Sequence, residues 1–371
     1  MRILADQNMP LVEAFFADMG EVERFDGRAI NAADVAGADV LLTRSVTQVN
    51  STLLSQAKQL KFVGTATIGM DHFDTEFLQQ QGIAYSNAPG CNAIAVAEYV
   101  ISGLLAYAQQ TNTRLRGKTI AIVGVGNIGS RLRDKVSALG LNVVLCDPVR
   151  HKNGSLDNHV ELDEALAQAD IVSFHVPLVK NGDCKTVHLL NAERIAALKP
   201  GMVIINASRG DVIDNNALLQ AMESGQQLEL ILDVWENEPH ILEPLLQYTR
   251  FASVHIAGHT LEGKARGTQM LYEALCNTLG VAAHKSITDF LPKPSISRCQ
   301  LEQTANEQDI TNLVHMVYDI RRDDGIMKAN LAQYGFDKLR KTYPVRREFS
   351  TITINSDSPI SQALADLGFS K

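Results

Sequence analysis

Short apolar runs alternate with amphipathic segments along most of the chain. In the first quarter, strands are expected at residues 1–4, 38–44, 60–66 and 83–87, with amphipathic pieces at 11–19 and 51–59 between them. A second series of apolar runs follows, at residues 117–123, 142–148, 170–177, 201–208 and 228–235. Strands that alternate with helical patterns are typical of an α/β fold with parallel sheets.

Two segments differ from this alternation. Residues 91–115 predict a long helix that is apolar beyond a single stripe, which favours packing between domains or subunits. Residues 286–371 combine a helical pattern at 309–322 with a strand-like alternation at 348–356. A further helix is expected with Ser358 as N-cap and Pro359 as its first residue. The tail therefore reads as a small α+β module.

Composition and charge narrow the class of protein. The chain has 371 residues, which predicts two or three domains, and its net charge of −8 argues against nucleic acid as a partner. The five cysteines are scattered without a C-x-x-C pair, which is typical of reduced thiols. Neither a signal peptide nor a membrane span is recognisable, so we expect a cytoplasmic protein with no membrane partner.

The segment "IAIVGVGNIG" indicates a dinucleotide cofactor. Gly124, Gly126 and Gly129 form G-x-G-x-x-G between an expected strand and an expected helix, as the dinucleotide fingerprint requires. Asp147 ends the next strand, where a carboxylate can accept from both ribose hydroxyls of NAD and repel the extra phosphate of NADP. The alternative is a plain glycine turn followed by a surface aspartate.

Three successive expected strands end in side chains suited to oxidising an alcohol. Arg209 follows one strand, the next is followed by the carboxylates of Asp233, Glu236 and Glu238, and His255 follows the third. A histidine can take the hydroxyl proton, a carboxylate beside it favours the protonated ring, and an arginine can grip a substrate carboxylate. Ligands of open α/β sheets collect at these strand ends, which places the three side chains in one crevice.

His255 and His259 also raise the possibility of a metal site. Their spacing of four would suit two ligands on a helix, but Gly258 separates them and the segment follows a strand. No third ligand has metal-like spacing, and the H-E-x-x-H glutamate is absent. We therefore expect no metal and take His255 as the base, with a buried structural histidine as the alternative.

The ordered motifs "VGVGNIG", "INASRGDVID", "LDVWENEP" and "HIAGHT" resemble the D-2-hydroxyacid dehydrogenases. The resemblance implies two Rossmann-like, doubly wound domains around a cleft and catalytic roles for Arg209, Glu238 and His255. It also implies contacts to NAD or to the substrate from further positions. The cofactor contacts would be Gly124, Gly126, Asn127, Ile128, Gly129, Asp147, Val176, Ala207, Asp233 and Gly258, and the substrate contacts Ser45, Thr67 and His259.

The tail motif "VYDIRRDD" and the segment "APGCNAIAVAEYV" narrow the resemblance to one branch of that family. That branch oxidises 4-phospho-D-erythronate to 2-oxo-3-hydroxy-4-phosphobutanoate in the synthesis of pyridoxal 5′-phosphate. The sequence departs from the pattern at Val254, where a proline usually stands, and at His259, where the branch has a tyrosine. Another D-2-hydroxyacid dehydrogenase, such as a D-3-phosphoglycerate enzyme, and a non-enzymatic NAD-sensing corepressor of the same fold are the alternatives.

The resemblance also sets the expected domains. These are a flavodoxin-like substrate domain of residues 1–93 and 260–285, an NAD-binding domain of residues 94–259, and a dimerisation domain of residues 286–371. A phosphorylated 2-hydroxy acid needs cationic donors, for which Arg44, Arg346 and Arg347 are the candidates. The apolar helix faces of the tail would need a partner, and a two-fold homodimer would supply one.

Overall fold

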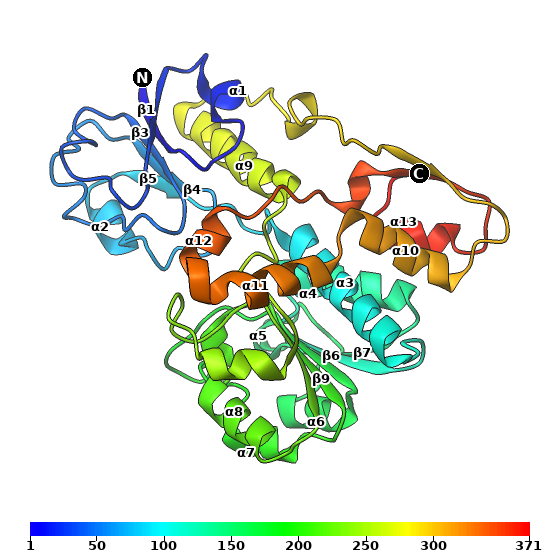
Figure 1. The fold of residues 1–371 in the computed structure, drawn as a ribbon. Coiled ribbons are helices and arrows are strands. Elements are labelled where there is room, and N and C mark those ends of the chain that lie inside the picture. Colours follow the sequence, from blue (N-terminus) through cyan, green and yellow to red (C-terminus); the bar gives the residue numbers. More distant parts are fainter. The chain divides into compact units, whose positions relative to one another are not determined.

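The computed structural model describes all 371 residues (Figure 1). It divides into two compact units, Met1–Asn92 with His259–Lys293 and Ala93–Gly258 with Pro294–Lys371. The C-terminal segment thus shares a unit with the residues expected to bind NAD. The three-domain division expected from the sequence stays a prediction.

The first unit is built on a five-stranded parallel sheet. Its strand order, β2-β1-β3-β4-β5, is that of flavodoxin-like domains. The strands are β1 (Arg2–Asp6), β2 (Glu21–Phe25), β3 (Val40–Thr43), β4 (Phe62–Thr65) and β5 (Ala84–Ser86). Four of them were predicted. The edge strand β2 was not, because its residues are half-buried or exposed and its sequence, EVERF, carries three charges.

Helices from both ends of this unit's sequence cover its sheet. They are α1 (Val12–Phe16), α2 (Thr75–Gln80), α9 (Leu261–Leu279) and the 3-10 turn η3 (Ile287–Asp289). Phe15 and Phe16 of α1 share one core with Leu271 and Leu275 of α9, so the returning helix completes the unit as expected. The helical piece expected at residues 51–59 is wrong, because these residues form consecutive turns.

The second unit contains a six-stranded parallel sheet with the order β11-β10-β9-β8-β6-β7. Its strands are β6 (Thr119–Val123), β7 (Asn142–Cys146), β8 (Ile171–Phe174), β9 (Met202–Asn206), β10 (Leu228–Leu232) and β11 (Thr249–Ala252). Its helices up to Tyr248 are α3 (Ala93–Thr111), α4 (Asn127–Ala138), α5 (Pro148–Lys152), α6 (Leu162–Gln168), α7 (Ala192–Ala197), α8 (Asn215–Glu223), η1 (Gly210–Val212) and η2 (Glu243–Tyr248). Strand order switches direction between β6 and β8, which is where open α/β sheets bind ligands.

The tail packs onto the same core as this sheet. It comprises α10 (Glu307–Val317), α11 (Ile320–Tyr334), α12 (Phe336–Lys341), α13 (Ser361–Leu367), η4 (Phe349–Thr351) and the paired strands β12 (Arg298–Gln300) and β13 (Thr353–Asn355). Helices α10 and α11 contact α3, and α13 contacts α4. Ile310, Leu313 and Val314 of α10 are buried there. The argument that these faces need a second copy is therefore wrong, although the dimer itself stays a prediction.

Two details of the tail also differ from the expectation. The last helix begins at Ser361, after an uncapped Ile360, and not at Pro359. The strand expected over residues 348–356 shrinks to Thr353–Asn355, because Phe349–Thr351 forms a 3-10 turn. All five cysteines are free thiols, and no helix has the length and apolarity that a bilayer span requires.

A buried histidine at the end of β8 makes the stability of the second unit sensitive to acid. Burial lowers the pKa of His175 to about 3, whereas a histidine in an unfolded chain titrates near 6.5. Between these pH values the unfolded chain binds a proton that the folded chain does not, so stability falls as the pH falls. We expect His175→Gln to flatten the fall of the thermal midpoint between about pH 6.5 and pH 4. Scanning calorimetry that gave the same slope for both proteins would contradict this assignment.

Candidate active site

The glycine loop after β6 leaves space in front of the first turn of α4. Gly124 has φ +89°, and a Cβ there would lie 2.6 Å from the backbone oxygen of His175. A Cβ on Gly129 would lie 2.0 Å from the backbone oxygen of Gly124, whereas one on Gly126 would meet nothing within 4 Å. The first and third glycines are therefore needed for the fold of the loop, and the second faces open space.

The same loop is fixed to the end of β7. Asp147 accepts from the backbone N–H of Val125 at 2.8 Å and from that of Arg150 at 2.9 Å, which caps α5. Each carboxylate oxygen therefore keeps room for a further donor, such as a ribose hydroxyl. Val176 follows β8 and lies against Gly124, while Ala207 follows β9. Val176 and Ala207 thus follow neighbouring strands of the same sheet.

His255 and Glu238 form a directly bonded pair. The Nδ1 atom of His255 lies 2.7 Å from Oε2 of Glu238, and the other oxygen of Glu238 accepts from the backbone N–H of Trp235 at 2.9 Å. The side chains are 30% and 21% exposed, so the ring is held on one side and still reachable. This leaves Nε2 as the nitrogen available to a substrate.

Arg209, Glu238 and His255 follow the strands β9, β10 and β11, which are neighbours in the sheet. Parallel neighbours present their carboxyl ends at the same edge, so the sequence prediction that these strand ends are adjacent is confirmed. Arg209 is half-buried, and its side chain donates to the backbone oxygen of Ser208 at 2.8 Å. The side-chain amide of Asn206 donates to the backbone oxygen of Arg209 at 2.9 Å, which fixes where the arginine leaves the strand.

In the first unit, the expected substrate residues follow two paired strands. Arg44 and Ser45 follow β3, and Thr67 follows β4, with Thr43 opposite Thr65 in the register. The Thr67 hydroxyl donates to the backbone oxygen of Gly69 at 3.1 Å. It also lies 2.7 Å from the hydroxyl oxygen of Thr65. Ser45 is exposed and Arg44 is half-buried. His259, also half-buried, lies just before α9.

The sequence matches two described families. Residues 94–260 match the D-isomer specific 2-hydroxyacid dehydrogenase, NAD binding domain, and residues 290–368 match a domain of unknown function, DUF3410. The chain is 62% identical over 369 residues to an erythronate-4-phosphate dehydrogenase of Pseudoalteromonas translucida, covering 100% of this chain and 99% of that one. A second such enzyme, from Tolumonas auensis, is 48% identical over 371 residues, with the same coverage. The chain belongs to the erythronate-4-phosphate dehydrogenases.

Solved structures of other proteins share the fold. The protein TT0316 of Thermus thermophilus is similar with a TM-score of 0.62 and 28% identity, covering 76% of this chain and 97% of that one. An NAD⁺-bound 3-phosphoglycerate dehydrogenase of Entamoeba histolytica has a TM-score of 0.65 at 22% identity, covering 76% of this chain and 95% of that one. The matched NAD binding domain and the named relatives show that the chain is a 2-hydroxyacid dehydrogenase with NAD as its cofactor.

The residues at the glycine loop fit that cofactor. The N-terminus of α4 offers free backbone N–H groups for a pyrophosphate, at Asn127 and Ile128 and beside the open position of Gly126. The carboxylate of Asp147 has acceptor capacity left beyond its two backbone N–H bonds, which is compatible with a ribose. The particular contacts assigned to each of these residues, to Val176, to Ala207 and to Gly258 stay predictions.

Asp233 has a structural task that the sequence did not show. Its carboxylate is 1% exposed and accepts from the hydroxyl of Ser253 at 2.6 Å and from the backbone N–H groups of Ile256 and Ala257 at 2.7 and 3.0 Å. Burial raises the pKa of Asp233 against the lowering effect of nearby His255 and these bonds. The residue braces the loop that carries His255, and its expected contact with NAD stays a prediction.

The placement of Arg346 contradicts the role expected for it. Its side chain is 2% exposed and lies over the ring of Tyr318, with the guanidinium 3.6 Å from the ring centroid. It donates to the backbone oxygens of Ala257 and Ala95 at 3.1 and 2.7 Å. A guanidinium engaged in this way is not placed to bind a substrate phosphate. Arg347 is half-buried, and its expected role stays a prediction.

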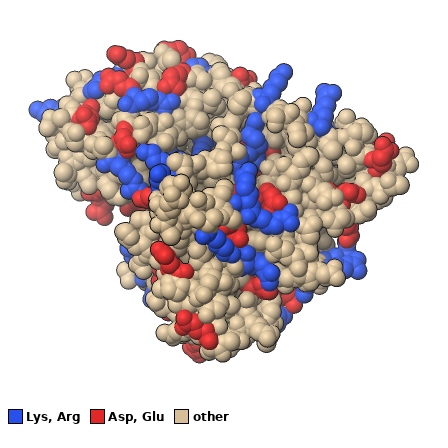
Figure 2. Space-filling model, in the orientation of Figure 1, with Lys and Arg blue, Asp and Glu red and all other residues tan.

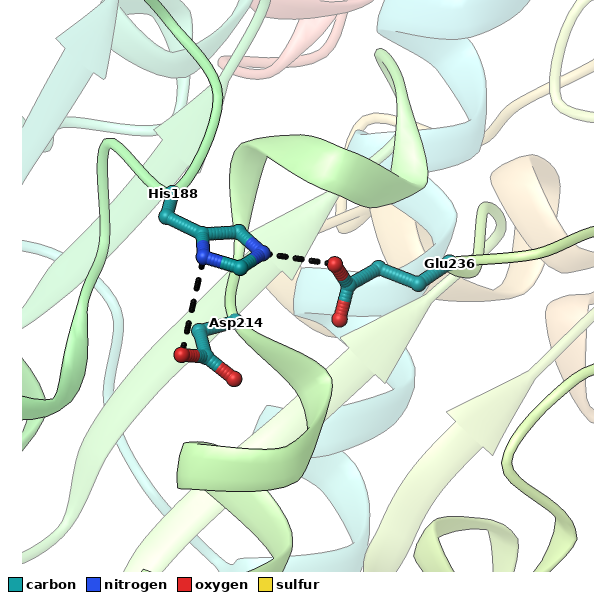
Figure 3. Close-up of side chains that lie close together, drawn as sticks. All are labelled: His188, Asp214 and Glu236. Carbon is teal, nitrogen blue, oxygen red and sulfur yellow. Dashed lines mark hydrogen bonds and ion pairs between the residues drawn. The ribbon is translucent and has the colours of Figure 1, made fainter.

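His188, Asp214 and Glu236 form a second polar cluster in the second unit (Figure 3). Nε2 of His188 lies 2.6 Å from Oε1 of Glu236, and Nδ1 lies 3.6 Å from Oδ2 of Asp214. The two carboxylates therefore meet opposite nitrogens of one imidazole ring. These two nitrogens point in different directions and cannot both bind the same ion. The second oxygen of Glu236 accepts from the backbone N–H of Asn215 at 2.8 Å. The cluster ties the loop after β10 to α8 and does not resemble a metal centre.

Proposed function

We propose that the chain oxidises 4-phospho-D-erythronate at C2 to 2-oxo-3-hydroxy-4-phosphobutanoate with NAD⁺, in the synthesis of pyridoxal 5′-phosphate. The observation that carries this proposal is the bonded pair of His255 and Glu238 at 2.7 Å. It occurs in a chain that is 62% identical over its full length to a relative named for this substrate. Lysine and arginine side chains also gather locally on the face drawn in Figure 2, although the net charge is −8, so an anionic substrate is compatible with the chain.

The chain's own residues would divide the reaction as follows. Nε2 of His255 takes the proton of the C2 hydroxyl, while Glu238 holds Nδ1 and stabilises the imidazolium that forms. Arg209 binds the substrate carboxylate and orients the C2–H bond. Bound NAD⁺ supplies the acceptor for the hydride. Ser45 and Thr67 are proposed substrate contacts, with His259 in the place of a tyrosine, and Arg44 and Arg347 remain the candidates for the phosphate.

Asp147 should set the preference for NAD over NADP. Asp147→Asn keeps an oxygen that can accept a backbone N–H but removes the charge that repels a 2′-phosphate. We therefore expect the ratio of kcat/KM for NAD to that for NADP to fall by about tenfold or more, which corresponds to ~1.4 kcal/mol. Initial rates with the two cofactors measure this ratio. An unchanged ratio would show that Asp147 does not select against NADP.

A substrate panel followed by NADH absorbance tests the proposal as a whole. We expect turnover of 4-phospho-D-erythronate to exceed that of D-3-phosphoglycerate and D-lactate by at least tenfold in kcat/KM. Preference for D-3-phosphoglycerate would assign the chain to a different reaction of the same family. Tight NAD binding without turnover of any acid would instead favour a non-enzymatic NAD sensor.

We also propose that the protein works in the cytoplasm as a homodimer. Four of the eight large hydrophobic side chains that are exposed, namely Ile296, Met316, Tyr334 and Val345, belong to the 86-residue tail at 286–371. The tail thus holds half of these exposed side chains in less than a quarter of the chain, which supports an interface there. Sedimentation velocity of the full chain tests the dimer, and a monomer at micromolar concentration would contradict it.

The free cysteines are compatible with the reducing compartment that the proposal of a cytoplasmic protein requires.

A further inference from the structure

The loop that carries His255 holds an unusual backbone conformation. His255 has φ +57°, in the left-handed region that residues with a side chain rarely adopt. Such a conformation is energetically unfavourable and persists only when neighbouring groups impose it. The direction of the imidazole therefore depends on what holds the backbone from residue 253 to residue 258.

One set of bonds comes from the sheet. The backbone N–H of His255 donates to the backbone oxygen of Asp233 at 2.7 Å, and the carboxylate of Asp233 takes the N–H groups of Ile256 and Ala257. These bonds satisfy three consecutive N–H donors of the loop. They leave its carbonyl oxygens to be held by other residues.

The other set comes from the tail. Nε of Arg340 donates to the backbone oxygen of His255 at 3.2 Å, and one terminal nitrogen of Arg346 donates to that of Ala257 at 3.1 Å. The other terminal nitrogen of Arg346 donates to Ala95, in the first turn of α3, at 2.7 Å. Arg346 thus joins the catalytic loop to the helix that opens the second unit.

The surroundings of Arg346 restrict its position. Its planar group rests on Tyr318, whose ring stacks on Tyr99 with a centroid distance of 6.3 Å. The hydroxyl of Tyr99 lies 2.9 Å from that of Ser253, which in turn donates to Asp233. A buried guanidinium is costly unless it is well bonded, and the nearby carboxylate of Asp323 favours its charged form. These contacts connect the tail to both sides of the catalytic loop.

We propose that Arg346 is a positioning residue for His255, and that the tail contributes to catalysis by holding the carbonyl side of this loop. The proposal rests on the function proposed above, because His255 must act as the base for its direction to matter. Misplacing a catalytic group by about 1 Å can cost 100-fold in rate. Arg340 acts in the same way, but its side chain is only half-buried and makes one such bond, so its contribution is smaller.

The test uses substitutions that separate positioning from packing. Arg346→Met keeps an unbranched side chain over Tyr318 but donates no hydrogen bond, and Arg346→Lys restores a donor. Leu364→Ala is the matched control, because Leu364 is 1% exposed in α13 and its loss weakens the packing of the tail. For each variant we would measure kcat, the KM for NAD, the thermal midpoint, and hydrogen exchange of peptides that cover residues 250–260.

We expect Arg346→Met to lower kcat by about 10- to 100-fold with the KM for NAD within about threefold, and to speed exchange in residues 250–260. Arg346→Lys should recover part of the rate, and Arg340→Ala should lower it less. Leu364→Ala should lower the thermal midpoint and retain kcat at 25 °C. If Arg346→Met does not fold, Arg340→Ala with the exchange measurement takes its place.

A folded Arg346→Met with kcat and loop exchange within twofold of the parent would overturn the proposal, as would equal losses of kcat in Arg346→Met and Leu364→Ala. If the parent protein does not oxidise 4-phospho-D-erythronate, the proposed function fails, yet the exchange measurement still decides whether Arg346 holds the loop.

Discussion

Replacing His255 with alanine should lower the turnover of 4-phospho-D-erythronate by about 10²- to 10⁴-fold, which is the usual contribution of a positioned acid–base group. NADH should still bind, because the ring serves proton transfer and the glycine loop after β6 lies in a separate segment. His255→Asn is the better-folded companion, since asparagine tolerates φ +57° more readily than alanine. Stopped-flow rates and NADH fluorescence titrations measure the two properties.

His188→Gln provides the matched control. His188 also has a positive φ, +51°, and is also bonded to a carboxylate, that of Glu236 at 2.6 Å. The replacement of His188 should retain turnover within about threefold. Near-normal turnover in both His255 variants would show that another group takes the proton.

Replacing Glu238 with glutamine should lower turnover nearly as much as replacing His255, because the two oxygens of Glu238 bind two different groups. One accepts from Trp235 and the other meets Nδ1 of His255. Glutamine has a single acceptor oxygen, so its amide N–H must face either Trp235 or the imidazole. If it faces the imidazole, the ring is held in the tautomer that carries its proton on Nε2 and cannot act as a base. We expect a fall in kcat of about 10²- to 10⁴-fold.

Glu236→Gln is the control, because Glu236 meets His188 and not His255. It should retain turnover within about threefold. Near-normal kcat in Glu238→Gln would argue against the pairing.

The parts of the structure that were predicted correctly depend on local sequence. The positions of the glycine loop, of Asp147 at the end of β7 and of the proposed catalytic side chains after β9, β10 and β11 all follow from strands whose apolar runs are unambiguous. The rule that parallel strands present their carboxyl ends together then placed Arg209, Glu238 and His255 at one edge. Glycine and strand patterns carry this information within a few residues.

The parts that were missed depend on contacts between distant segments. Arg346 stands beside another arginine in "YPVRREF", a pattern that usually indicates a solvated surface. Its burial arises from Tyr318, Ala95 and Ala257, and the last two lie 251 and 89 residues away along the chain. The apolar face of α10 correctly indicated that this helix packs against another element. Nothing in the sequence of α10 shows whether that element is α3 of the same chain or a second copy of the protein.

The central claim is that hydride leaves C2 of 4-phospho-D-erythronate while His255 takes the hydroxyl proton. The most direct measurement uses this substrate with deuterium at C2 and follows both the rate and the mass of the reduced cofactor. We expect reduced cofactor heavier by one deuterium, together with a primary isotope effect on the hydride-transfer step. Reduced cofactor without deuterium, or no reduction of NAD⁺ by this substrate, would contradict the account.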